Sequence, residues 1–109
     1  MVLIRVNKTE YKIPIEDLKS DYFSGFSDSD VIDLDKVYGR YMEYVFDYYA
    51  SNSKRGKDLI IELITQGGKF NERLQYILHH SNYFGLDELM NICINIIIRQ
   101  MYDISTRYS

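Results

Sequence analysis

The chain has 109 residues, of which 46% are hydrophobic and 27% are charged, a balance typical of one soluble globular domain. Its formal net charge is −3 and its basic residues are scattered, which argues against general affinity for nucleic-acid phosphates. The single cysteine, Cys93, excludes a disulfide within the chain, and no apolar run, 96–98 included, is long enough to span a bilayer.

The N-terminal residues have the pattern of a β-hairpin. Residues 2–6 are rich in β-branched and aliphatic side chains, residues 7–10 are turn-like, and residues 11–15 alternate between apolar and polar. Pro14 cannot donate a ladder hydrogen bond, so we expect the second strand to end there or to lie at an edge.

A short helix, a loop and a third strand are expected next. Residues 16–23 can form a short helix with Leu18, Tyr22 and Phe23 on its apolar side, and residues 25–30 are rich in Gly, Ser and Asp, as loops are. Residues 31–35 read as a strand whose Val31, Ile32 and Leu34 point largely inward and whose two aspartates point outward.

Helical spacing begins in the middle of the chain. Within residues 38–50, four apolar side chains recur at the positions of one helical face: Met42, Val45, Phe46 and Tyr49. Residues 51–57 are polar. Residues 59–66 are ambiguous; we predict a helix, with a strand as the alternative.

Two further helices are predicted on either side of a glycine. Residues 71–81 carry one apolar stripe, and Gly85 breaks the pattern. A second helix follows with Cys93 on its apolar stripe, and its reverse side is apolar at Ile94 and Ile98, so we expect this helix to be central. Residues 102–109 carry no strong signal and are expected to form a loose tail. The order of elements predicts an α+β fold for one domain over residues 1–109.

Catalytic and metal-binding chemistry finds little support. His79 and His80 are adjacent on a predicted helix, so their rings point about 100° apart and do not converge on one ion. We expect them at the surface or partly packed, and Cys93 in the core. The aspartates of 28–35 lack the glycine and closing glutamate of a calcium loop. No catalytic residue, cofactor or metal is expected; a deep pocket joining either histidine to a carboxylate would revive an enzymatic role.

The eleven tyrosines are the stronger functional signal. Five of them fall within one predicted helix and cannot all point to the core: Tyr38, Tyr41, Tyr44, Tyr48 and Tyr49. Tyrosine is enriched at protein interfaces, where its ring buries area and its hydroxyl finds a partner. The alternative is that these rings fill the rim of a small domain.

The stretch from residue 74 to residue 98 resembles the C-terminal half of a BTB/POZ domain. Members of that family often show a helix ending in an apolar run, a short break, and a second helix with spaced leucines and a cysteine. The counterparts here are Ile77-Leu78, then Ser81-Asn82-Tyr83-Phe84, then Leu86 and Leu89, then Cys93.

The resemblance implies a BTB/POZ-like α+β fold, with a small N-terminal sheet of about three strands packed on about five to six helices. The chain starts at the first core strand and the family's two alanines before the break are replaced by His80 and Ser81. Its organisation is most similar to stand-alone Skp-type adaptors and elongin C. Asn82-Tyr83 matches the motif whose asparagine and aromatic residue lie at the cullin-contacting surface of those adaptors.

The resemblance therefore implies a protein–protein interaction adaptor of cullin-based ubiquitin ligases, or a viral mimic of one, in the cytoplasm or nucleus. Its partner would be a cullin-like scaffold, a substrate receptor or both, with no nucleic acid, membrane or small-molecule substrate. The alternative is a self-associating homodimeric module. The residues expected to contact a partner are Asn82, Tyr83, Tyr41, Tyr44 and Tyr48.

Overall fold

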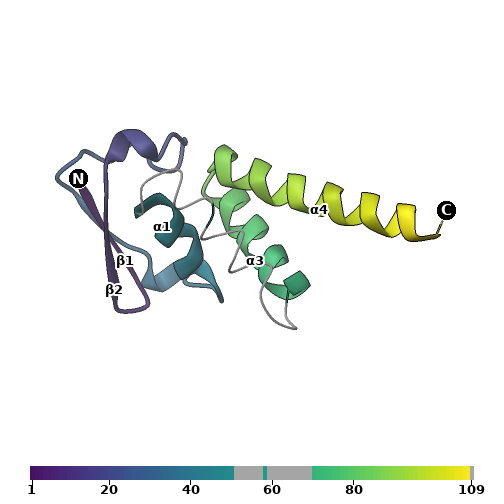
Figure 1. The fold of residues 1–109 in the computed structure, drawn as a ribbon. Coiled ribbons are helices and arrows are strands. Elements are labelled where there is room, and N and C mark those ends of the chain that lie inside the picture. Colours follow the sequence, from purple (N-terminus) through teal and green to yellow (C-terminus); the bar gives the residue numbers. More distant parts are fainter. Residues whose placement is uncertain (51–57, 59–69, 109) are drawn as a thin grey trace.

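The computed structural model describes residues 1–50, 58 and 70–108. Within these residues, three strands are followed by three α-helices: α1 (Met42–Ala50), α3 (Phe70–Tyr83) and α4 (Asp87–Tyr108) (Figure 1). The protein is therefore a small α+β protein, and that part of the fold prediction is confirmed. Segment 59–66, predicted as a helix with a strand as the alternative, lies outside the described residues.

The sheet is built on a central first strand. Strands β1 (Val2–Val6), β2 (Thr9–Ile13) and β3 (Val31–Asp33) lie in the order β2-β1-β3, with β2 antiparallel and β3 parallel to β1. The hairpin turn is Asn7-Lys8 alone, both with positive φ, as a two-residue type I′ turn requires. The turn is therefore shorter than the predicted 7–10, while the second strand ends before Pro14 as expected.

The predicted helix over 16–23 is wrong. The chain forms a single 3₁₀ turn, η1 (Ile15–Asp17), and then further turns. Serine side chains satisfy the backbone here in place of helical hydrogen bonds: the Phe23 N–H donates to the Ser20 hydroxyl, and the Ser24 hydroxyl donates to the Asp21 carbonyl. Of the three side chains predicted on the apolar side, Leu18 and Phe23 are buried, whereas Tyr22 is exposed.

The third strand is also shorter than predicted. It ends at Asp33, and a second 3₁₀ turn, η2 (Asp35–Val37), follows. The Asp33 carboxylate accepts the Asp35 N–H at 2.9 Å, which turns the chain. Ile32 and Leu34 are buried as expected, but Val31 is exposed, because side chains alternate along a strand and its neighbour faces the core.

One hydrophobic core joins the sheet to the helices. Three phenylalanines from separate segments meet in it: Phe23 from the loop, Phe46 from α1 and Phe84 from the corner after α3. Their ring centroids lie 5.5 to 6.4 Å apart. Aromatic pairs at such distances add favourable edge and stacking contacts to the burial itself.

A glycine corner connects α3 to α4. Gly85 has φ +68°, its N–H donates to the Asn82 carbonyl, and the Leu86 N–H donates to the Ser81 carbonyl at 2.8 Å. This pair of bonds is a Schellman motif, which ends a helix on a glycine in the left-handed region. The predicted break is confirmed, and Cys93 lies in the core.

Helix α4 departs from its predicted central position. Its first turns pack on the core, and the rest of the helix extends away from the body (Figure 1). Ile94 is exposed, and Ile98 keeps 56% of its surface exposed. An apolar circumference therefore did not mean burial here, because no described element covers this part of the helix. No helix within the described ranges is both long and apolar enough to cross a membrane.

Candidate protein-contact surface

Asn82 and Tyr83 lie exposed in the last turn of α3. Tyr83 is 52% exposed, and its ring centroid is 5.7 Å from that of Tyr22, which is 37% exposed. Tyr22 in turn makes edge contacts at 4.9 Å with the buried rings of Phe23 and Phe84. We call Tyr22, Asn82 and Tyr83 the corner patch; it is an exposed aromatic pair supported from below by the aromatic core.

A shallow hollow of about 320 Å³ lies at this patch. Burial and the neighbouring Tyr83 raise the pKa of Tyr22, so its hydroxyl stays neutral at physiological pH and can donate or accept a hydrogen bond. The hollow mixes these rings with charged and small polar groups. Its lining consists of Lys19, Ser20, Asp21, Tyr22, Asn82, Tyr83, Phe84, Gly85 and Asp87.

Two of the predicted tyrosines form a separate cluster. Tyr41 and Tyr44 are half-buried and stack with centroids 5.7 Å apart and planes 10° apart. Tyr41 also meets the edge of Tyr76 on α3, and the Arg40 guanidinium lies 5.1 Å from the Tyr41 ring centroid. These contacts of Tyr41 join the cluster to α3 and to the Arg40 guanidinium, and not to the corner patch.

Tyr48 does not belong to an exposed surface. It is 2% exposed, and its hydroxyl donates to the Glu88 carboxylate on α4 at 2.8 Å. Burial raises the pKa of this hydroxyl, and the adjacent carboxylate adds to the rise. The expectation of an accessible Tyr48 is wrong, because a carboxylate distant in the sequence lets the ring enter the core with its hydroxyl satisfied.

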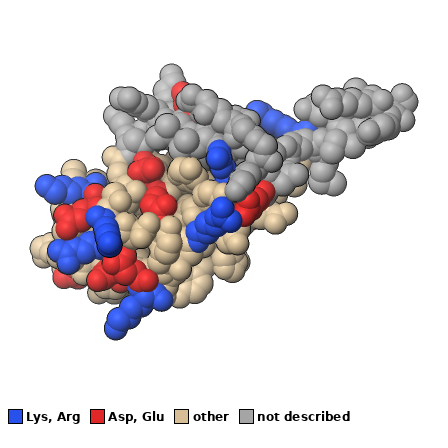
Figure 2. Space-filling view, turned by 90° about the horizontal axis from the view of Figure 1, so that it is seen from below, with Lys and Arg blue, Asp and Glu red and all other residues tan. Residues whose placement is uncertain are grey.

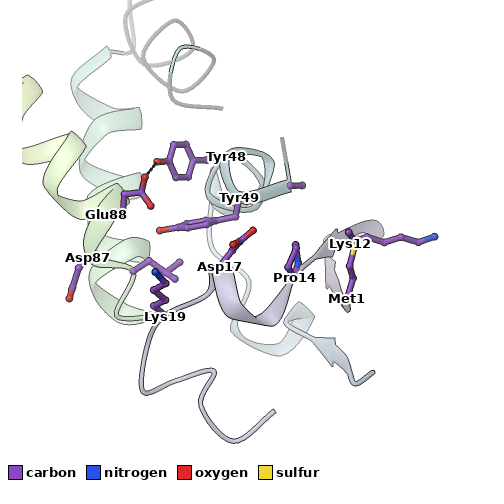
Figure 3. A pocket seen from close by; sticks show the side chains of 11 residues that line it. Met1, Lys12, Pro14, Asp17, Lys19, Tyr48, Tyr49, Asp87 and Glu88 are labelled. Carbon is purple, nitrogen blue, oxygen red and sulfur yellow. Dashed lines mark hydrogen bonds between the residues drawn. The ribbon is translucent and has the colours of Figure 1, made fainter. Parts of the chain in front are cut away.

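A larger cavity, of about 730 Å³, lies between the η1 segment, the end of α1 and the start of α4 (Figure 3). We call it the α1–α4 groove. Sequence analysis missed it, because its residues come from four separate segments; a local signal was the acidic pair Asp87-Glu88 at the start of an apolar helix. Its lining consists of Met1, Lys12, Pro14, Asp17, Lys19, Tyr48, Tyr49, Ala50, Leu86, Asp87 and Glu88.

The histidines do not join either of these cavities. His79 is exposed, but His80 is only 5% exposed, which contradicts the prediction of a surface or partly packed pair. Its Nε2 donates to the Arg40 carbonyl at 2.8 Å, and Gly39 leaves room for the ring. Burial lowers the pKa of His80, so the ring is neutral at physiological pH.

The other groups of the described residues give no support to nucleophilic, metal-binding or phosphate-binding chemistry. Burial raises the pKa of the Cys93 thiol to about 11, which keeps it protonated and poorly nucleophilic. Among the described residues, no three side chains of His, Cys, Asp or Glu gather as metal ligands would. On the face drawn in Figure 2, basic and acidic side chains of the described residues lie beside one another, so that face offers no broad basic area for a phosphate backbone.

Comparisons with protein-family models, with curated proteins and with solved structures found no match for this chain. The resemblance to BTB/POZ domains therefore stays a prediction from the sequence.

Proposed function

We propose that the protein is a protein–protein interaction adaptor with the organisation of a BTB/POZ domain of the Skp type, acting in a cullin-based ubiquitin ligase or as a mimic of its adaptor. The observation that carries the proposal is the exposed Tyr83 beside Asn82 at the end of α3, supported by Tyr22 and the buried phenylalanines. In the resembling adaptors an asparagine and an aromatic residue at this place face the cullin.

The order of elements supports the proposal. A hairpin, a third strand, α1, and two helices joined at a glycine corner follow one another in the order that the resemblance implies, but the short helix that it implies between the hairpin and the third strand is replaced by a 3₁₀ turn. The described residues contain three α-helices, α1, α3 and α4, against the five to six that the resemblance implies for the domain.

The corner patch has the physical character of a binding hot spot. Such spots are enriched in tyrosine and lie on rigid, well-packed supports, because a ring that is already held loses little conformational entropy on binding. Tyr83 meets Tyr22 and Phe84, and both of its neighbours contact the core. Polar and charged groups at the hollow supply the rim that excludes water from the anchors.

A cullin pull-down tests this function directly. The full chain should recover a cullin from cell extract, and the double variant Asn82→Lys/Tyr83→Lys should recover at least about tenfold less, as loss of a hot spot predicts. Val31→Lys/Val37→Lys is the control, since it places the same two charges at other exposed apolar positions. Failure of the wild-type chain to recover any cullin would rule out the proposed scaffold.

Self-association is the second candidate function. The specific observation in its favour is that Ile94 and Ile98, one turn apart on α4, are both exposed apolar side chains. A homodimer that buries this face would be converted to a monomer by Ile98→Lys, as measured by sedimentation equilibrium at micromolar protein. A wild-type chain that sediments as a monomer would exclude this function.

A further inference from the structure

The α1–α4 groove has the size and composition of a binding site for part of another molecule. Its volume of about 730 Å³ lies within the usual range of ligand cavities, about 300 to 1,000 Å³. Its lining mixes the buried Leu86 and the half-buried Tyr49 with exposed charged side chains. An occupant must therefore offer both apolar surface and charge.

The acidic side chains of the groove are available to an incoming cation. Asp17, Asp87 and Glu88 line it, and the ion pairs among the described residues join other groups: Met1 with Asp28, Arg5 with Glu10, and Arg40 with Glu72. Within the described residues, none of these three carboxylates is therefore in an ion pair.

One of these carboxylates is also held in place. The Tyr48 hydroxyl donates to Glu88 Oε1 at 2.8 Å, and Tyr48 itself is fixed in the core (Figure 3). A carboxylate that is already oriented loses less conformational entropy when it binds a cation, so its binding free energy is more favourable.

The basic residues of the groove do not cancel this charge. Figure 3 shows the Lys12 side chain extending away from the labelled carboxylates, which leaves Lys19 as the one lysine of the described residues near them. Helix α4 begins at the groove, and the N-terminal end of a helix carries partial positive charge. The carboxylates of Asp87 and Glu88 in its first turn offset that charge.

We propose that the α1–α4 groove docks an arginine-bearing segment of a protein partner, with the guanidinium at Glu88, Asp87 adding negative charge from the adjacent helix position, and the aliphatic stem against Tyr49 and Leu86. Arginine suits this lining because its planar head pairs with carboxylates and stacks on aromatic rings, while its stem covers apolar surface. This surface is distinct from the three residues of the corner patch, so it would let the chain hold a second protein segment.

Titration of the ¹⁵N-labelled chain with a blocked peptide, acetyl-Ala-Leu-Arg-Leu-Ala-amide, tests this inference by NMR. The expected result is a saturable shift of the amides of residues 48–50 and 86–88, with binding about fivefold weaker for the same peptide carrying uncharged citrulline, as loss of one ion pair predicts. Equal binding of the citrulline peptide, or tighter binding of its glutamate counterpart, would overturn the proposal.

Variants of the groove give the matched comparison. Asp87→Asn/Glu88→Gln should weaken binding about fivefold, as removal of paired charges predicts, while its carboxamide at position 88 can still accept the Tyr48 hydroxyl. Glu10→Gln/Glu72→Gln removes two carboxylates outside the groove and should bind as the wild type does. Unchanged binding by the groove variant would overturn the proposal. The proposal would also be overturned if the same amides shifted with increasing protein concentration in the absence of peptide, because a second copy of the chain would then be the occupant.

The groove and the corner patch can fail independently. The groove variant leaves Asn82 and Tyr83 in place, so loss of peptide binding with cullin recovery intact would confirm the groove and leave the adaptor proposal standing. Recovery of cullin without any peptide binding by the wild type would reject the groove alone.

Discussion

His80 shows how one buried side chain can tie stability to pH. Its ring lies against Gly39, where an added Cβ would come within 2.6 Å of the ring, and its Nε2 donates to the Arg40 carbonyl. Desolvation, with a smaller contribution from His79, lowers the pKa of His80, while the Arg40 carbonyl and Glu43 oppose this shift without cancelling it. The folded protein therefore resists protonation more than the unfolded chain does.

Stability should fall on acidification through the range in which the unfolded histidine titrates. Because the folded pKa lies below the ordinary value of 6.5, this contribution is complete above that value and is lost as pH falls toward the folded pKa. The urea midpoint of the wild type should decrease between about pH 7.5 and about pH 5. His79→Gln should show nearly the same decrease, and His80→Gln a smaller one from a lower starting midpoint. A wild-type midpoint that stays constant over this range would contradict the expectation.

The Tyr48 hydroxyl should contribute measurably to stability. Tyr48→Phe keeps the buried ring and removes the donor to Glu88, so we expect a loss of about 1 kcal/mol in the free energy of unfolding, as for a typical hydrogen bond. Tyr83→Phe removes a hydroxyl from a half-exposed ring and should change stability by less than about 0.5 kcal/mol. Urea unfolding measures both; equal losses would show that the bond to Glu88 adds nothing.

At the scale of elements, the corner between α3 and α4 depends on its glycine. Gly85 has φ +68°, and an added Cβ would lie 3.2 Å from the Ser20 Cβ. We expect Gly85→Ala to cost about 1 to 2 kcal/mol from the left-handed backbone, with some further cost from the close contact.

Gly25→Ala provides the matched comparison for this corner. A Cβ at Gly25 meets nothing within 4 Å, and its φ lies outside the left-handed region, so the substitution should leave the thermal midpoint nearly unchanged. Equal midpoints for the two alanine variants would refute a special role for Gly85.

Periodicity predicted the helices well where each packs by its own apolar face. The stripes of α1 and α3, the break at Gly85 and the buried Cys93 all follow from spacing alone. The helix predicted at 16–23 did not form, because Ser20 and Ser24 bind nearby backbone in turns. Local patterns carry no information on such competition.

The candidate sites were harder to predict, because they join distant segments. Asn82 and Tyr83 were found from a motif, but Tyr22 was expected on the apolar side of a helix. The burial of Tyr48 depends on Glu88, and the α1–α4 groove depends on four segments that meet only in the folded chain. Sequence patterns describe one element at a time and do not specify such partners.

At the scale of the whole molecule, the core is shared by every described layer. Phe23, Phe46 and Phe84 connect the long loop, α1 and the α3–α4 corner, and the sheet residues Val2, Ile4 and Ile13 belong to the same cluster. A continuous core of this kind couples its elements, so the described part of the chain should unfold as one unit.

Phe84→Leu tests this coupling. The variant should lose about 1 to 3 kcal/mol, because it removes aromatic contacts from the centre of the core. Far-UV circular dichroism, which follows the helices, and tyrosine fluorescence, which also reports on Tyr11 in β2, should shift to the same lower urea midpoint. Separate midpoints for the two signals would show that the sheet and the helices unfold independently.

The order of strands in the sheet has a consequence for how the chain folds. Strands β1 and β2 are joined by the two residues Asn7-Lys8 and can pair as soon as both are present. Strand β3 reaches the other edge of β1 only after the chain has closed a loop over residues 14–30, and it pairs in parallel. Closing that loop costs chain entropy before its contacts form. We therefore expect the hairpin to form early and the docking of β3 with the helices to set the folding rate.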